Sequence, residues 1–461
     1  MSNDITTALA GKPIGRLLLQ YSLPAIIASL ATSLYNIVDS IFIGRGVGPM
    51  ALTGLAITFP LMNLVTAFCV LIAVGGSTVS SIFMGQKRMD KTELVVGNVT
   101  IVVLLHSMIL VTLGLFFLDP VLYFFGATDQ SIDYAREFMR IILLATPLSY
   151  IFLSLNNIMR ATGYPRKAMI SALFSVVVNI AVAPVLIFVL DWGMRGAAIA
   201  TVAGQTAGLV WVLIHFMSPK SNVHFTRGCW KLSGNIIKRM YEIGLSPFLM
   251  NCCTCFVVVL INHALLKSAG ADGNLAVGAY GIINRTTTFF IMIIWGVTQG
   301  MQPILGFNYG AACWPRVSRT LRLGLMVASV ISAIGFAATE LFPDQISKLF
   351  TTDVNMIDIA RPGFRIFFMF YLLVGPQIVI QNYFQSIGHP KLSIFLSLTR
   401  QLIFLVPGLW LLPPLLGVDG VWTAMCSSDC LAFILAVITG VVMNRHIKKE
   451  LTQMAAQRIQ K

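Results

Sequence analysis

The chain contains few charged residues for its length. Lys, Arg, Asp and Glu together make up 11% of its 461 residues, whereas a typical soluble domain has roughly 25%. Only 18 residues are acidic, and the formal net charge is +14. This low charge, beside a hydrophobic fraction of 57%, excludes an ordinary soluble enzyme.

Cysteine is scarce too, and several chemical motifs are missing. Cys252, Cys253 and Cys255 cluster inside an apolar run, without the paired spacing of a zinc site. We interpret them as small packed side chains and expect no disulfide and no metal. The sequence lacks a Walker A motif, a His/Glu metal box and a G-x-S-x-G elbow. We therefore predict no cofactor, no ATP hydrolysis and no enzyme activity.

Long apolar runs are what the sequence has in abundance. Each is about 20 residues or more, enough to cross a bilayer, and they are continuous rather than alternating as in a barrel. The polar first residues show no cleavable signal peptide, so we expect the first span to act as its own signal. The twelve predicted spans are 17–44, 52–83, 94–118, 135–160, 166–190, 196–217, 240–266, 275–305, 318–341, 359–387, 391–413 and 419–443.

The basic residues are unevenly divided between the two sets of alternating loops. One set holds 22 Lys and Arg, and the other holds only Arg45, Arg195, Lys267 and Lys348. Because cytoplasmic loops carry an excess of Lys and Arg, both termini are predicted to be cytoplasmic. The positive charge is thus explained by topology and predicts no nucleic-acid partner. We expect a multi-pass protein of the plasma (inner) membrane, surrounded by lipid and monomeric.

The chain repeats itself. Positions 133–141, "DYAREFMRI", match 358–366, "DIARPGFRI", at five of nine places with an offset of 225. The matches Asn157/Asn382, Gly163/Gly388 and Pro165/Pro390 keep that offset, and Gly196/Gly420 and Ala200/Ala424 have an offset of 224. Ordered matches at a nearly constant offset indicate two homologous halves.

Six spans in each half predict two parallel lobes. We expect an all-α integral membrane protein of twelve transmembrane helices, its two six-helix lobes related by a pseudo-two-fold axis along the membrane normal. The predicted domains are an N-lobe at 1–217, a basic cytoplasmic linker at 218–240 and a C-lobe at 241–461. Transporters with paired lobes hold their cargo between them and rock one lobe against the other.

Asp39 is an acid deep inside the first span, and such residues are usually functional. Tyr35, Asn36 and Asp39 share one helix face at positions i, i+1 and i+4. Desolvation favours the neutral carboxyl, so Asp39 can bind and release a proton near neutral pH or hold a small cation. Two alternatives stay open. Hydroxyls and amides satisfy Asp39 in one, and Arg285 pairs with it as a gate in the other.

The remaining intramembrane polar residues have simpler interpretations. Arg400 and Asp429 each lie about ten residues into antiparallel neighbouring spans, so both sit at roughly 15 Å depth. They predict a structural ion pair. Asn179, Thr201 and Gln205 are each better explained as packing hydrogen bonds unless they converge on Asp39, and His106 is interpreted as a packed residue.

Three segments resemble a known family. The chain is similar to the multidrug and toxic compound extrusion (MATE) transporters, in particular the bacterial multidrug efflux branch without an acid in the second lobe. The repeated "AREFMRI" and "ARPGFRI" add to the resemblance. The segments are 24–60, "PAIIASLATSLYNIVDSIFIGRGVGPMALTGLAITFP", 155–169, "LNNIMRATGYPRKAM", and 179–188, "NIAVAPVLIF".

The resemblance implies a two-lobed antiporter that exports organic cations and amphipathic drugs in exchange for H⁺ or Na⁺. It implies cation coupling at Asp39, with Asn179, Asn157 and Thr201 as family counterparts, and a pocket tyrosine at Tyr35. We take further substrate-pocket candidates from both halves: Asn36, Gln205, Asn284, Arg285 and Met292.

One departure bears on the coupling ion. Family members usually have Asp before the fifth-helix proline, whereas this chain has Ala183 before Pro184. Since Na⁺ needs several hard oxygens, a single carboxylate favours H⁺. In this hypothesis, protonation of Asp39 removes the counter-charge of a bound drug and releases it outward. The main alternative is a flippase for a lipid-linked saccharide, which would need a strongly cationic cavity. A non-transporting receptor is a third and weaker hypothesis.

Overall fold

The computed structural model describes residues 2–219 and 221–459. Lys220 and Lys461, two of the cations counted on the predicted cytoplasmic side, lie outside the described residues. Helices and no strands are found in the described part of the chain. Eleven helices there are long and apolar enough to span a membrane, and one bent pair makes a twelfth. The predicted all-helical membrane fold is confirmed.

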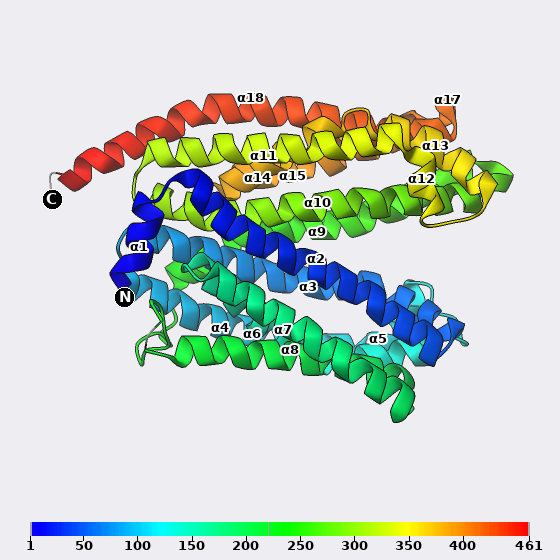
Figure 1. The fold of residues 1–461 in the computed structure, drawn as a ribbon, viewed down its shortest axis with the longest axis horizontal. Helices are drawn as coiled ribbons and strands as arrows, with labels where there is room; N and C mark the ends of the chain where they lie inside the picture. The colour runs from blue at the N-terminus through cyan, green and yellow to red at the C-terminus, as the bar shows by residue number, and fades with distance from the viewer. Residues whose placement is uncertain (1, 220, 460–461) are drawn as a thin grey trace. The chain divides into compact units, whose positions relative to one another are not determined.

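The first half of the chain contains nine helical segments (Figure 1). They are α1 (Ser2–Gly11), α2 (Ile14–Gly46), α3 (Pro49–Gly85), α4 (Met89–Phe116), α5 (Leu118–Phe124), α6 (Ile132–Ala161), α7 (Pro165–Pro184), the π-helical η1 (Val185–Val189) and α8 (Gly193–Met217).

The second half repeats this order with more breaks. Its segments are α9 (Gly234–Ser268), the 3₁₀ turn η2 (Gly270–Asp272), α10 (Gly273–Gly310), α11 (Trp314–Leu341), α12 (Pro343–Lys348), α13 (Val354–Phe368), α14 (Tyr371–Ser386), α15 (Pro390–Leu398), the π-helical η3 (Thr399–Leu405), α16 (Val406–Leu411), α17 (Pro413–Leu416) and α18 (Val418–Ile459).

The tenth span was expected to be one helix at 359–387 but is bent. It consists of α13 and α14, which meet at an angle of 52°. Pro362 and Pro376 lie on either side of the bend, and each removes a backbone N–H donor from its helix.

The repeated Gly-x-Pro sequence ends one helix and begins the next in both halves. Gly163 has φ +107° and Gly388 has φ +79°, a left-handed conformation that glycine adopts without steric strain. Pro165 and Pro390 then occupy the first turns of α7 and α15, where the missing N–H leaves no intrahelical bond unmade. The repeat therefore encodes the same tight turn twice.

The described chain forms two compact units that differ from the predicted domains. Unit 1 contains the N-terminal segment up to Lys12 and Leu23–Phe248, and unit 2 contains Pro13–Ser22 and the chain from Leu249 onward. The predicted boundaries at 217 and 241 are wrong for these units. The first helix of each half, α2 or α9, is divided between units within two residues of a proline, Pro24 or Pro247.

The predicted linker, 218–240, packs as part of unit 1. Asn98 is fully buried, donates to the carbonyl of Lys231 at 2.9 Å and accepts from the N–H of Ser233 at 2.8 Å. Cys229 is also buried, and its carbonyl lies where a side chain on Gly97 would project. Polar groups of the linker thus find partners on α4, which a composition-based boundary does not reveal.

Close helix contact holds the first part of α9 in unit 1. A Cβ on Gly244 would lie 1.6 Å from the carbonyl oxygen of Leu71, and one on Gly75 would lie 2.0 Å from that of Met240. The hydroxyl of Tyr241 and Nε2 of His106 are 2.6 Å apart. His106 therefore has a packing partner in this contact.

Matching Arg–Asp pairs attach a short helix in each unit. Arg136 of α6 donates to both carboxylate oxygens of Asp119 in α5, at 2.8 and 3.1 Å. Arg361 of α13 does the same to Asp344 in α12, at 2.7 and 2.9 Å. Both members of the pair keep the 225-residue offset. This contact explains why Arg recurs in the "AREFMRI" and "ARPGFRI" segments.

Gly244→Ala is expected to lower the free energy of unfolding by about 1–3 kcal/mol, because the methyl group overlaps the backbone of α3. The matched control is Gly234→Ala in the same helix, where no atom of the described residues lies within 4 Å of the added carbon. Thermal unfolding in detergent measures both. Equal melting temperatures for the two variants would contradict the close contact.

Arg136→Gln is expected to lower the melting temperature at pH 7 but not in acid. The hydrogen bond from Arg136 lowers the pKa of Asp119 below its ordinary value. A lowered folded-state pKa contributes stability that is present above about pH 4 and is lost as pH falls toward that lowered value. Melting curves from pH 7 to pH 3 should therefore converge for wild type and variant. A pH-independent difference, or an equal loss in Arg45→Gln, would refute this ion-pair explanation.

Candidate functional site

Unit 1 contains a cavity of about 350 Å³ between α2, α3, α6, α7 and α8. No Asp, Glu, Lys or Arg is among the described residues that line it. Its polar lining is Thr32, Tyr35, Thr66, Thr146, Ser149, Tyr150, Asn156, Ser175, Asn179, Thr201 and Gln205, and the remainder, including Met62 and Phe152, is mainly apolar. Such a lining solvates an amphipathic molecule without neutralising a charge.

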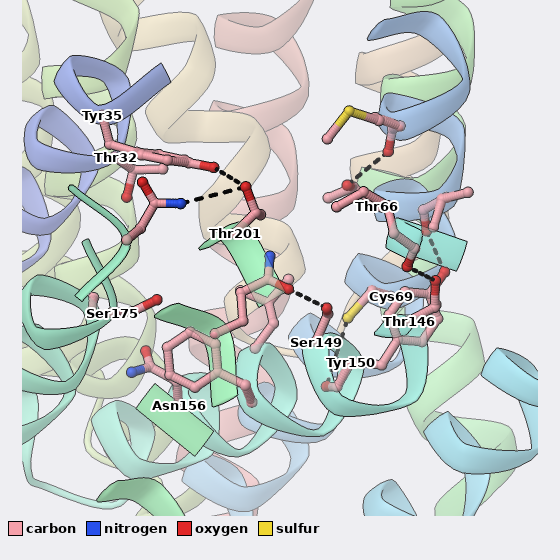
Figure 2. Close-up of a pocket in the computed structure, with 18 of the residues that line it drawn as sticks. Thr32, Tyr35, Thr66, Cys69, Thr146, Ser149, Tyr150, Asn156, Ser175 and Thr201 are labelled. Carbon is pink, nitrogen blue, oxygen red and sulfur yellow. Dashed lines mark hydrogen bonds between the residues drawn. The ribbon is translucent and has the colours of Figure 1, made fainter. Parts of the chain in front are cut away.

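Three polar side chains from three helices converge on one wall of the cavity (Figure 2). The hydroxyls of Tyr35 and Thr201 are 3.1 Å apart, and Nδ2 of Asn179 donates to Oγ1 of Thr201 at 3.4 Å. Thr201 also donates to the carbonyl of Ala197 in its own helix. Thr201 is thus the common partner that ties α2 and α7 to α8.

A second polar group lies on α6. Ser149 donates a hydrogen bond to Oε1 of Gln205, and Asn156 donates to the carbonyl of Ala168 at 2.9 Å and to the hydroxyl of Ser171 at 2.6 Å. Figure 2 shows Ser149 and Asn156 along the α6 side of the pocket. These bonds hold α6 against α7 and α8 through neutral groups.

Asp39 lies one helical turn beyond Tyr35 and does not line the cavity. It is 6% exposed, although the residues around it in 31–40 are half-buried or exposed. Its Oδ1 atom is buried and has no hydrogen-bond partner among the described residues. The carboxyl is close enough to Tyr35 to interact with it electrostatically. A buried oxygen without a partner is destabilising and can accept a proton or contact a cation.

The structure brings together only part of the predicted site. Tyr35, Asn179, Thr201 and Gln205 line one cavity, as convergence on the first span would require. Asn36 is exposed and lies outside the cavity lining.

The predicted Asn157 is also outside the lining. Its side chain donates to the carbonyl of Leu153 at 2.8 Å and accepts from Arg160. Its neighbour Asn156 is the α6 amide that reaches the cavity.

The predicted residues of the second half belong to unit 2. Asn284 and Arg285 are exposed on α10, and Met292 on the same helix is half-buried. Arg400 and Asp429 do meet, with Nε and Oδ1 2.7 Å apart and the Asp429 side chain 5% exposed. Asp429 therefore has a cation partner, unlike the described surroundings of Asp39 Oδ1.

Several lining residues were not predicted from the sequence. Thr146, Ser149 and Ser175 are small hydroxyl residues of the kind that packed membrane helices often contain. A usable signal is nevertheless present, because Thr146 and Ser149 lie three residues apart and so share one face of α6.

A multi-span helical bundle with a polar cavity inside one unit is the architecture of a membrane transporter. The profile of the family described as MatE matches residues 24–185 and 245–411, most of both halves. The chain belongs to the MATE family of transporters.

Similar proteins span nearly the whole chain. The multidrug export protein MepA of Staphylococcus haemolyticus is 26% identical over 433 residues, covering 94% of each protein, and that of Staphylococcus aureus strain NCTC 8325 is 25% identical over 434 residues, covering 94% and 95%.

Two solved structures extend the comparison. The MATE multidrug transporter DinF-BH, solved in complex with a drug, is 35% identical, has a TM-score of 0.86 and covers 94% of this chain and 96% of its own. An outward-facing MATE family transporter has a TM-score of 0.91 at 22% identity, with coverage of 96% and 99%. The second of these supports the two-lobed fold alone.

Thr201→Val is expected to lower the free energy of unfolding by about 1–2 kcal/mol, because Tyr35 and Asn179 lose their shared hydroxyl. The matched control is Thr206→Val in the same helix, where the hydroxyl bonds only to the carbonyl of Val202 among the contacts described. Thermal unfolding in detergent compares the two. A control loss as large as that of Thr201→Val would refute the special role of Thr201.

Proposed function

We propose that this protein is a secondary active exporter of organic cations and other amphipathic drugs, coupled to H⁺ through Asp39. The observation that carries the proposal is a buried carboxyl oxygen without a partner among the described residues, one turn from a neutral cavity. The Staphylococcus proteins named above are multidrug exporters, and DinF-BH has been solved with a bound drug. These relatives support a small-molecule drug as the cargo.

The charge of Asp39 provides a physical basis for exchange. A cation beside Tyr35 lies roughly 8 Å from the carboxyl group, since one helical turn rises about 5.4 Å. At an effective dielectric constant of about 20, an ionised carboxylate there attracts the cation by about 2 kcal/mol. Protonation removes this attraction, so drug and proton bind at each other's expense.

The same geometry explains how occupancy can reach the helices. Tyr35 links α2 to Thr201 of α8, and Thr201 links to Asn179 of α7. Protonation of Asp39 changes the field acting on Tyr35 and thus favours a different arrangement of these hydrogen bonds. A coupling ion shifts the transport states only if they differ in affinity for it.

Proton coupling is favoured over Na⁺ by the ligands that surround Asp39. Position 183, where relatives usually carry a second carboxylate, is a fully buried alanine. A proton needs one acceptor, whereas Na⁺ needs several oxygens. We also propose a monomer in the plasma (inner) membrane with both termini in the cytoplasm, on the basis of the 22-to-4 distribution of Lys and Arg.

The lipid-linked saccharide alternative has less support. A pyrophosphate needs a cationic cavity, and the described lining of the unit 1 cavity contains no Lys or Arg. Arg400, one of two Arg residues predicted deep within the second-half spans, is paired with Asp429. Drug export therefore fits the described cavity better than lipid flipping.

Asp39→Asn is expected to abolish proton-driven efflux of ethidium and to weaken cation binding about thirtyfold, the equivalent of about 2 kcal/mol. Proteoliposomes with a pH gradient or a Na⁺ gradient imposed separately measure transport, and equilibrium dialysis measures binding. Asp90→Asn, which removes an exposed acid near the start of α4, is the matched control. Undiminished efflux by a well-expressed Asp39→Asn protein would eliminate the proposal, and efflux driven by Na⁺ alone would eliminate proton coupling.

A further inference from the structure

The internal repeat relates three lining residues of the unit 1 cavity to three residues of unit 2. With the offset of 225 that joins Pro165 to Pro390, Ser175 of α7 corresponds to Arg400. The same offset relates Thr146 of α6 to Tyr371. With the offset of 224 that joins Ala200 to Ala424, Gln205 of α8 corresponds to Asp429. All three unit 1 residues border the open space.

The three counterparts lie together in unit 2. Arg400 Nε donates to Asp429 Oδ1 at 2.7 Å. Tyr371 is 1% exposed and close enough to both ionised groups to interact with them electrostatically. Asp429 is 4% exposed, so the ion pair is largely withdrawn from solvent. Residues that surround a cavity in one unit are therefore in mutual proximity in the other.

The substitutions between the halves add bulk at this position. Thr146 becomes a tyrosine, Ser175 becomes an arginine, and Thr201 becomes Met425 at the 224 offset. The longer side chains extend into space that short hydroxyl residues leave open in unit 1. Arg400 also lies on the π-helical segment η3, and π-helical turns frequently occur at functional sites.

We propose that the cluster of Tyr371, Arg400 and Asp429 closes, in unit 2, the space that unit 1 keeps open as its cavity. The repeated architecture thereby contains one cargo pocket instead of two, and the cluster determines which unit holds it. The word cargo rests on the proposed function, whereas the closure of unit 2 does not depend on it.

The chemistry of the cluster fits a role in filling and locking. An ion pair removed from solvent is neutral overall and fixes both side chains in one geometry. Removing a single partner leaves an uncompensated charge, while replacing both by apolar residues of similar volume is often tolerated. The decisive variants must therefore change Arg400 and Asp429 together.

Matched cysteines report whether the space is open. Ala172→Cys lies three residues before Ser175 and lines the cavity, and its counterpart at offset 225 is Ser397→Cys, three residues before Arg400. Ser397 is 4% exposed. Each cysteine is reacted with aminoethyl methanethiosulfonate in the purified full chain. Mass spectrometry of the labelled peptides separates it from the native cysteines.

The opened variant carries the unit 1 residues, Tyr371→Thr, Arg400→Ser and Asp429→Gln. Ala172→Cys should label at the same rate in wild-type and opened backgrounds. Ser397→Cys should label at least tenfold more slowly than Ala172→Cys in the wild-type background, and at least tenfold faster in the opened background than in the wild type. Equal rates for the two cysteines in the wild-type background, or no acceleration in a monodisperse opened variant, would overturn the closure.

The filled variant, Arg400→Met with Asp429→Leu, keeps the test decisive if the opened variant does not fold. It removes both charges but keeps the volume, so slow labelling of Ser397→Cys and continued transport are expected. Fast labelling or lost transport in a folded filled variant would show that charge, rather than filling, is what matters, and the proposal would fail.

Protection by tetraphenylphosphonium separates this inference from the proposed function. The cation should slow labelling of Ala172→Cys and leave Ser397→Cys unaffected in the wild-type background. Absence of protection at Ala172→Cys would count against cargo binding in the cavity while leaving the closure intact. Protection at Ser397→Cys would overturn the restriction of cargo to unit 1.

Discussion

The need to satisfy polar groups away from water constrains every part of this membrane protein. Most buried side chains meet that need locally, as Thr201 does with Tyr35 and Asn179, and Arg400 does with Asp429. Asp39 does not, because its Oδ1 atom is buried without a hydrogen-bond partner among the described residues. A group in that condition gains free energy by binding a proton or a cation, and the proposed exchange of drug for proton depends on this one deficit.

The two halves share a framework but differ in what they place inside it. The Gly-x-Pro turns and the Arg–Asp pairs recur at nearly the same offset, so both units build the same helix order. Their interiors diverge: unit 1 combines Thr146, Ser175 and Gln205 around a cavity, and unit 2 combines Tyr371, Arg400 and Asp429 in a buried cluster. Duplication supplied the scaffold, and a few side-chain volumes and charges account for the difference.

Helix contacts, rather than chain order, define the compact units. The first part of α9 is held in unit 1 by backbone contact at Gly75 and Gly244, which admits no larger side chain without a shift. Ser22 of α2 is in turn close to Gly300 and donates to the carbonyl of Val297 in unit 2. Predicted domain limits at 217 and 241 followed the loop composition and therefore missed both exchanges, which depend on packing between distant segments.

The sequence by itself determined the membrane class, the twelve spans, the two homologous halves and the importance of an acid at position 39. These follow from local hydropathy, charge and repetition, which are properties of neighbouring residues. Only the tertiary structure decided that Asn156 and not Asn157 reaches the cavity, that Ser149 and Ser175 line it, and that the linker belongs to unit 1. Such choices depend on the rotation of each helix about its axis and on contacts between residues far apart in the chain, and neither is fixed by composition or spacing alone.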